Sequence, residues 1–196
     1  RLSPAMHLFA TSMVAFGASL SAFWIMVANS WMQTPRGGFF DKGKFVLTSH
    51  LEAIFNPDMV WGVPHMWVAA LEISLFVVGG LSAWYLYKNR HTGFFLASFK
   101  WAAVAAILIT PLQIWLGDGS GRMAYLYDPS KLAAFEAHWH TNPPGEGAPF
   151  SILAWPDPEI QDNRWSIEIP AVLSLLTTHT TTGQIRGLLA FPREDR

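Results

Sequence analysis

The sequence predicts an all-α membrane protein with three transmembrane helices of a larger helical bundle, followed by an outer-face loop region. Of its 196 residues, 51% are hydrophobic and only 14% are charged, whereas soluble domains carry about 25% charged residues. Residues 2–35 contain no Asp, Glu, Lys or Arg, residues 59–87 contain only Glu72, and residues 92–116 contain only Lys100. Because a span needs about 20 apolar residues, each segment is long enough to cross a bilayer.

We place the transmembrane helices at about residues 5–32, 59–87 and 92–116, within a first region of residues 1–116. Lys100 lies near one end of its segment, where the aliphatic stem can carry the ammonium to the interface. Buried helices of soluble proteins are seldom this long and uniformly apolar, so a membrane bundle is the better interpretation.

The basic residues predict the orientation of these helices. The turn at residues 88–91 contains Lys88 and Arg90 and no acid, and Arg1 precedes the first helix. Basic residues concentrate in cytoplasmic loops, so this turn and Arg1 are expected on the cytoplasmic side. The connection 33–58 and the acid-rich region 117–196 are then expected on the outer, periplasmic face.

Two outer segments show helix signals of their own. Within residues 44–55, apolar residues recur at helical spacing, which predicts a short amphipathic helix on the outer interface. Residues 117–196 contain the turn sequences DP, NPPG, WPDP and FP, so most of this region is predicted to be loop. One helix is expected over residues 128–140, because Asp128 suits an N-cap and Pro129 suits the first helical position.

Charge and cysteine content exclude several classes of function. The formal net charge is −1, which gives no bulk attraction to nucleic acid. The absence of Cys excludes disulfides and thiolate metal sites. The chain begins with Arg1 and ends on FPREDR without a closing element, so we expect it to be a piece of a longer protein.

Two titratable residues lie inside the second predicted span. His65 is about seven residues from the outer end of this helix, roughly 10 Å deep. A neutral imidazole there can bind haem iron, or it can be an interfacial His hydrogen-bonded to a carbonyl group or water. Glu72 is deeper, and a carboxyl group at that depth usually faces a bundle interior. It is either a proton relay or a neutral acid hydrogen-bonded to a neighbouring helix.

The first predicted span contains the small polar residues Ser19, Ser21 and Asn29. Such residues more often hold helices together than bind ligands.

Lys131 and Glu136 are the candidate reactive pair in the outer region. They are five residues apart, about 140° around a helix, so they do not form an i,i+4 ion pair. A cation and a carboxylate near a membrane surface can hold and deprotonate a polar head group. The alternative is an ordinary solvated face of a helix. Because His65 is expected near the same face, the arrangement suits oxidation of a lipid-soluble reductant.

Several stretches resemble subunit I of the cytochrome bd-type quinol oxidases. They are LSAFWIMVANSWMQTP (20–35), GGLSAWYLYKNR (79–90), LGDGSG (116–121), KLAAFEAHW (131–139) and GLLAFPREDR (187–196). The resemblance implies a haem-bearing bacterial or archaeal membrane protein that oxidises ubiquinol or menaquinol and reduces dioxygen to water. It implies that His65 is an axial ligand of the low-spin haem b, and that Lys131 and Glu136 are the quinol-loop pair. The closing stretch resembles relatives with the shorter quinol loop, often called cyanide-insensitive.

The resemblance also implies what this chain lacks. In the family, the ligands of the high-spin haem b and of the third haem, d or b, lie before Arg1, and the Met that completes the low-spin site lies after Arg196. The chain alone is therefore not expected to reduce oxygen, and a second oxidase subunit and membrane lipid are expected partners. Asp128 stands where many relatives have Gln before the Pro, and Glu72 matches no universal role in the family.

A function of another class stays open, namely a non-catalytic membrane-anchor or ion-transport subunit with Glu72 as a relay and His65 structural. The visible spectrum of the full-length protein distinguishes the two, because only the oxidase requires haem bands.

Overall fold

The structure, a computed structural model, describes residues 3–195 and divides into two compact units, Arg1–Gly117 and Asp118–Arg196. The first contains two of the long helices, most of a third, and a small β-hairpin; the second contains the end of that third helix and a longer β-hairpin.

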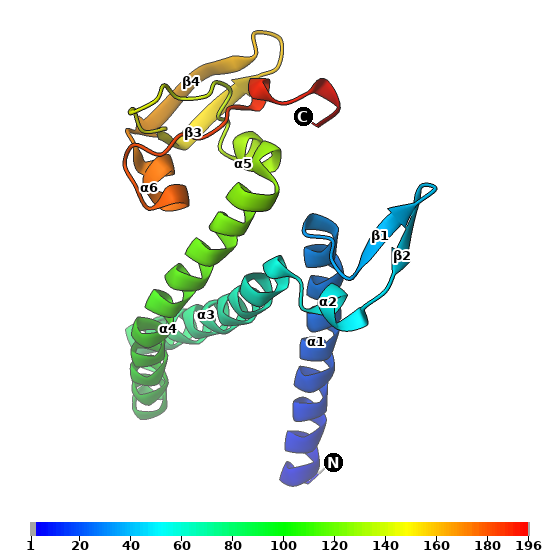
Figure 1. The fold of residues 1–196 in the computed structure, drawn as a ribbon. Helices are drawn as coiled ribbons and strands as arrows, with labels where there is room; N and C mark the ends of the chain where they lie inside the picture. Colours follow the sequence, from blue (N-terminus) through cyan, green and yellow to red (C-terminus); the bar gives the residue numbers. More distant parts are fainter. Residues whose placement is uncertain (1–2, 196) are drawn as a thin grey trace. The chain divides into compact units, whose positions relative to one another are not determined.

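Three long helices dominate the chain (Figure 1): α1 (Pro4–Gln33), α3 (Pro57–Tyr87) and α4 (Thr92–Tyr127). All three are long and apolar enough to cross a membrane. Most of their large apolar side chains are exposed in this chain, as expected of helices whose surroundings are lipid and other helices. The predicted fold class, an all-α membrane protein with three transmembrane helices, is confirmed.

A buried polar cluster joins α1 to the start of α3. Asn56, which is fully buried, caps α3 by accepting a hydrogen bond from the Met59 backbone N–H at 3.0 Å. The same side chain donates to Ser30 Oγ at 3.1 Å and accepts from Thr34 Oγ1 at 2.9 Å. A small apolar core lies beside this cluster, formed by Val27, Met59 and Val63. The cap therefore sets both where α3 begins and how it meets α1.

The third helix is longer than predicted. It was expected to end near residue 116, but α4 continues to Tyr127. Gly117 and Gly121 weaken a helix by about 1 kcal/mol each without ending it, and polar residues can continue a helix beyond the hydrocarbon. The helix ends where Pro129 disfavours helical dihedral angles for Asp128, whose φ and ψ are −141° and 63°.

The connection between α1 and α3 is only partly helical, so the amphipathic helix predicted over residues 44–55 is wrong in its first half. Strands β1 (Gly38–Asp41) and β2 (Lys44–Leu47) form an antiparallel hairpin, followed by the short helix α2 (His50–Ile54). Lys42 and Gly43 both have positive φ, 47° and 77°, as a two-residue type I′ turn requires. The Phe45 ring packs edge-on against Trp31 of α1, with centroids 4.8 Å apart.

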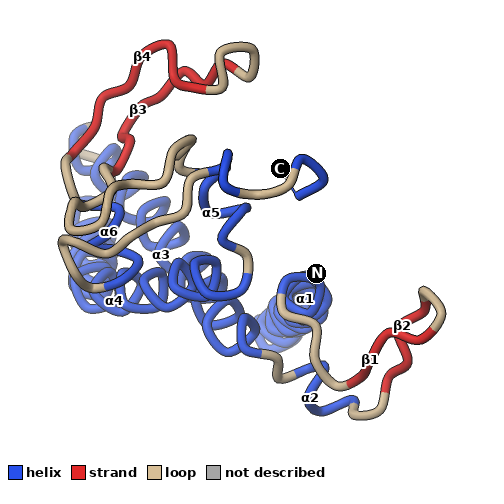
Figure 2. Tube along the Cα trace, turned by 45° about the horizontal axis from the view of Figure 1, so that its top comes forward, coloured by secondary structure: helices blue, strands red, loops and turns tan. Residues whose placement is uncertain are grey.

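The second unit contains more regular structure than the predicted loop. After α5 (Pro129–Phe135) come strands β3 (Phe150–Asp157) and β4 (Asp162–Ile169), which pair antiparallel (Figure 2). Helix α6 (Val172–Thr178) and the short 3-10 turns η1 (Leu188–Ala190) and η2 (Arg193–Asp195) complete the unit. Its core is formed by Leu132, Ala148, Leu173 and Ile185. Residues 164–169 alternate between polar and apolar side chains, which is typical of a strand. The prediction of a loop rested on the neighbouring Pro-rich turns and did not use this alternation.

Helix α5 is also shorter than the predicted helix over residues 128–140. It ends at Phe135, and Ala137 adopts a left-handed conformation with φ 49°. The His138 N–H bonds to the Ala133 carbonyl at 2.9 Å and the Ala137 N–H to the Ala134 carbonyl at 3.4 Å. These two bonds form a Schellman motif, which ends the helix and leaves Glu136 as its C-cap residue.

Candidate functional site

His65 lies in the first half of α3, and its ring is directed at α4. His65 Nε2 is 3.4 Å from Gln113 Nε2. One turn further along α4, a Cβ atom added to Gly117 would lie only 3.1 Å from His65 Cε1. Gly117 therefore lets the imidazole approach the α4 backbone more closely than any larger residue would allow.

Two polar atoms at this contact are buried without a partner. Neither His65 Nδ1 nor Gln113 Oε1 has a hydrogen-bond partner among the residues that the structure describes. Buried side-chain nitrogen and oxygen atoms are usually paired, so an unpaired imidazole nitrogen calls for an explanation. The lone pair of an axial imidazole is taken up by iron, but Nδ1 here faces α4, 3.6 Å from the position of a Cβ atom added to Gly117. The ligand role of His65 stays a prediction.

His65 is the single candidate ligand at this place. Within residues 3–195, no group of three or more His, Asp or Glu side chains could hold a metal ion. The nearby aromatic residues pack between helices: Trp61 lies edge-on to Trp115 of α4 at 5.1 Å, and Trp67 stacks with Phe23 of α1 at 6.2 Å.

Glu72 also contacts α4. Thr110 Oγ1 donates a hydrogen bond to Glu72 Oε1 at 2.6 Å, and both residues are partly buried. Glu72 and His65 are two turns apart on α3, and Thr110 and Gln113 are about one turn apart on α4. The two pairs together make a polar seam between α3 and α4, defined by His65, Glu72, Thr110 and Gln113.

Lys131 and Glu136 lie at the beginning and the end of α5. The ammonium of Lys131 is 5.4 Å from the centroid of the Phe135 ring. Glu136 is half-buried at the C-cap, and this burial raises the pKa of its carboxyl group. A carboxylate with a raised pKa binds a proton more readily near neutral pH than an exposed glutamate does. Their part in quinol binding stays a prediction.

A polar cavity of about 290 Å³ lies directly after Glu136, and no feature of the sequence analysis predicted it. Its lining includes His138, His140 and Glu168. His138 Nε2 lies 3.3 Å from the Ile185 carbonyl oxygen, which can accept its hydrogen. Burial lowers the pKa of His138, and the bond to Ile185 and the charge of Glu168 partly offset that effect. A neutral imidazole in a polar cavity can accept a proton.

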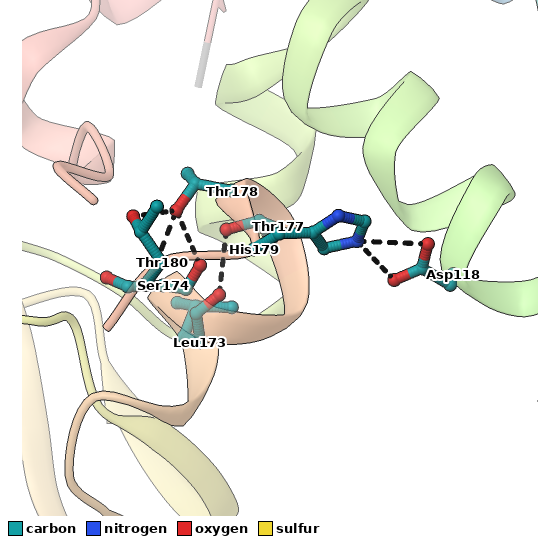
Figure 3. Close-up of polar contacts among 7 residues, drawn as sticks. All are labelled: Asp118, Leu173, Ser174, Thr177, Thr178, His179 and Thr180. Carbon is teal, nitrogen blue, oxygen red and sulfur yellow. Dashed lines mark hydrogen bonds and ion pairs between the residues drawn. The ribbon is translucent and has the colours of Figure 1, made fainter. Parts of the chain in front are cut away.

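A hydrogen-bonded contact between His179 and Asp118 joins α6 to the part of α4 that belongs to the second unit (Figure 3). His179 Nε2 lies 3.0 and 3.1 Å from the two carboxylate oxygens of Asp118. His179 ends α6 in a left-handed conformation with φ 58°, and hydroxyl groups of the last turn bond to backbone carbonyls, for example Thr177 to Leu173. About half of the His179 side chain is exposed, so the contact adds little to the free energy of unfolding. Its effect is to hold the end of α6 beside Asp118.

Known proteins match along the whole chain. The family model for cytochrome bd terminal oxidase subunit I matches residues 1–196. The chain is 37% identical over 190 residues to cytochrome bd-II ubiquinol oxidase subunit 1 of Escherichia coli (strain K12), covering 96% of this chain and 37% of that protein. It is 32% identical over 199 residues to cytochrome bd ubiquinol oxidase subunit 1 of Bacillus subtilis (strain 168), covering 99% of this chain and 41% of that protein.

A solved structure agrees with these matches. The bd oxidase from Geobacillus thermodenitrificans is similar with a TM-score of 0.81 and 29% identity, over 100% of this chain and 44% of the solved chain. The chain thus spans 37–41% of the length of the two curated relatives above. The family model matches this chain from end to end, two relatives are more than 30% identical to it, and the solved structure has the same fold. The chain therefore belongs to the cytochrome bd terminal oxidase subunit I family.

Proposed function

We propose that this chain is the part of a respiratory quinol oxidase in which quinol gives up its electrons and protons. The complete enzyme would oxidise ubiquinol or menaquinol and reduce dioxygen to water. The names of the relatives, which are ubiquinol and menaquinol oxidases, support this class of reaction. The observation that carries the proposal is His65, a partly buried titratable residue inside the apolar helix α3, whose Nδ1 atom has no partner among the described residues.

His65 would be one axial ligand of a low-spin haem b, which when bound accepts electrons one at a time from quinol. The work of this chain's own residues is to hold the imidazole, exclude water and move protons. Gly117 keeps space for the ring, and Trp61 and Trp115 cover one side of the α3–α4 contact.

Lys131 and Glu136 would act on the quinol head group. Quinol releases two protons for each pair of electrons, and a carboxylate beside its hydroxyl group can take one. Burial raises the pKa of Glu136, which strengthens it as an acceptor. Lys131 would bind a quinol oxygen and stabilise the negative charge that develops as the proton leaves.

The rest of the enzyme would surround this chain. The high-spin haem b and the third haem, d or b, would be ligated by parts of subunit I outside these residues, and a second subunit would complete the assembly. Residues 117–196 would lie on the outer face of a bacterial or archaeal cell membrane, the side on which quinol protons are released.

The test is His65→Ala in the complete enzyme. We expect the low-spin haem b signal to disappear from the reduced-minus-oxidised spectrum, because iron loses its imidazole. His50→Ala, which changes an exposed histidine of α2, is the matched control and should keep the signal. An unchanged low-spin signal in His65→Ala would refute the ligand role, and a wild-type protein without haem would favour the membrane-anchor alternative.

A further inference from the structure

We propose that an anionic phospholipid binds where α3 and α4 meet near the turn at residues 88–91. Its phosphate group contacts Lys100, and one acyl chain occupies a groove between the two helices. The site is built from residues other than His65, Lys131 and Glu136, so the lipid is a ligand that the quinol oxidase reaction itself does not require.

Lys100 is a cation without an anion in this part of the chain. Residues 73–117 contain no Asp or Glu. Lys100 is exposed, and it forms no ion pair among the described residues. It lies a little more than two turns into α4, roughly 12 Å along the axis from the first residue of the helix. A charge at such a depth in a membrane is costly without a counter-ion, so an anion supplied by the membrane would stabilise this arrangement.

An apolar groove of about 470 Å³ lies beside Lys100, between α3 and α4. Its lining includes Leu75 and Val78 of α3 and Phe94, Ala97 and Trp101 of α4. A second hollow of about 430 Å³ shares Ala97 and Trp101 with this groove, and Lys100 lines it. The ammonium group therefore stands at the edge of a continuous apolar surface. A phospholipid has the complementary arrangement, a charged phosphate next to a hydrocarbon chain.

Contacts between α3 and α4 fix the walls of the groove. Ala102 is buried, and a Cβ atom added to Gly79 would lie 3.8 Å from the Cβ atom of Ala102. Closer to the turn, the Tyr85 ring stacks on the Phe95 ring with centroids 4.4 Å apart and an interplanar angle of 3°. The groove is therefore preformed, and an acyl chain can enter it without separating the helices.

Aromatic and basic side chains place this end of the helix pair at the membrane interface. Trp101 is 75% exposed, and the ammonium of Lys88 lies 5.0 Å from the Trp84 ring centroid and 5.6 Å from that of Tyr87. Trp and Tyr are enriched at the level of lipid head groups, and basic pockets between transmembrane helices bind anionic head groups. An apolar helix of another protein would cover the groove but leave Lys100 without an anion, whereas an anionic phospholipid supplies both the charge and the chain.

The experiment uses the complete oxidase in phosphatidylcholine vesicles that contain a photoactivatable phosphatidylglycerol with a diazirine in its acyl chain. A phosphatidylcholine with the same diazirine chain is the matched probe without net charge. After irradiation, mass spectrometry of the peptides measures the labelling of residues 94–105. We expect phosphatidylglycerol to label these residues about fivefold more than phosphatidylcholine, because one basic side chain at the membrane surface favours an anionic lipid by about this factor.

Lys100→Ala should remove the excess labelling by phosphatidylglycerol, and Lys100→Arg should keep it because the positive charge remains. Lys44→Ala, which removes an exposed cation of β2, is the matched control and should leave the excess unchanged. High salt should reduce the excess in the wild type, because it screens exposed charges.

Equal labelling by the two probes in the wild type would overturn the proposal, because it would show ordinary lipid contact without selection for charge. An unchanged excess in Lys100→Ala would overturn it as well. A lack of labelling by both probes would show that protein covers the groove, which also contradicts a lipid site. The comparison of the two probes in the wild type needs no variant, so it decides the question even if Lys100→Ala does not fold.

Discussion

Thr110 and Glu72 illustrate how single residues are accommodated inside the spans. The Thr110 hydroxyl donates to Glu72 Oε1 at 2.6 Å, so the carboxyl group has a partner on the neighbouring helix. Both a neutral structural acid and a proton relay are compatible with this bond, but a paired acid needs no further role. We therefore interpret Glu72 as a structural acid that joins α3 to α4.

Glu72→Gln distinguishes the two roles. The amide oxygen can still accept from Thr110, so we expect the variant to fold and to keep most of the quinol oxidase turnover of the complete enzyme. The measurement is steady-state oxygen consumption with quinol. A proton relay cannot work through an amide, so turnover below about a tenth of wild type would contradict the structural interpretation.

For the loop pair, Lys131→Ala and Glu136→Ala should each lower quinol oxidation about a hundredfold, a typical contribution of general acid–base catalysis. Haem content should stay normal, because neither residue is proposed to touch iron, and artificial electron donors should still support oxygen reduction. Glu159→Ala, an exposed acid between β3 and β4, is the control. Wild-type quinol rates in both variants would mean that the pair is an ordinary helix surface.

The raised pKa of Glu136 gives this reaction a pH dependence. A protonated carboxyl group cannot accept the quinol proton, so activity should fall as the pH falls through the pKa of Glu136. Because burial raises that pKa above 4.5, the loss should begin at a higher pH than for an exposed glutamate. The pH profile of kcat, compared with that of Glu136→Gln, measures it, since the amide should abolish this acid limb and leave a low, flat rate.

At the scale of helices and strands, Asn56 is the residue on which the joint between α1 and α3 depends. It caps α3 and bonds to Ser30 and Thr34 of the preceding helix region, all within a buried cluster. Asn56→Ala should lower the free energy of unfolding by about 2–3 kcal/mol, from a lost cap and unpaired buried partners.

Thermal or denaturant unfolding of the detergent-solubilised protein measures this loss. Ser74→Ala, which removes an exposed hydroxyl bonded within α3 itself, is the control and should change stability little. Equal stabilities of the two variants would show that the cluster contributes no more than ordinary packing.

The second unit shows how a local conformation places Glu136, the proposed proton acceptor. Ala137 adopts a left-handed conformation that costs a residue with a Cβ atom roughly 1–2 kcal/mol. The Schellman motif around it ends α5 at Phe135, so Glu136 lies at the helix end and the chain turns directly into the polar cavity lined by His138 and His140. A continuous helix, as predicted over residues 128–140, would have kept Glu136 on a regular helix face.

For the whole molecule, the distribution of basic residues predicts the side of the membrane on which each part lies. Single cysteines introduced at positions 90 and 131 of this Cys-free chain should differ in labelling by a membrane-impermeant maleimide. In intact cells, position 131 should be labelled and position 90 protected, because Lys88 and Arg90 are expected on the cytoplasmic side. Position 90 should become reactive once the membrane is permeabilised; labelling of it from outside before that would contradict the topology.

The sequence by itself determined the membrane character of the chain and the number of long apolar helices, because hydropathy and length are local properties. It also singled out His65 and Glu72, since a titratable residue within an apolar segment stands out without knowledge of its neighbours. Short motifs such as ANSWMQTP and KLAAFEAHW were sufficient for the family.

Only the tertiary structure decided what these residues contact. Gln113 approaches His65 across 48 positions of sequence, and Thr110 approaches Glu72 across 38, because α3 and α4 lie against each other. The β1–β2 hairpin replaced a predicted helix since pairing of Phe40 with Phe45 and packing of Phe45 on Trp31 outweigh the helical spacing of a few apolar residues. Such pairings depend on where the chain returns in space, which no local pattern records.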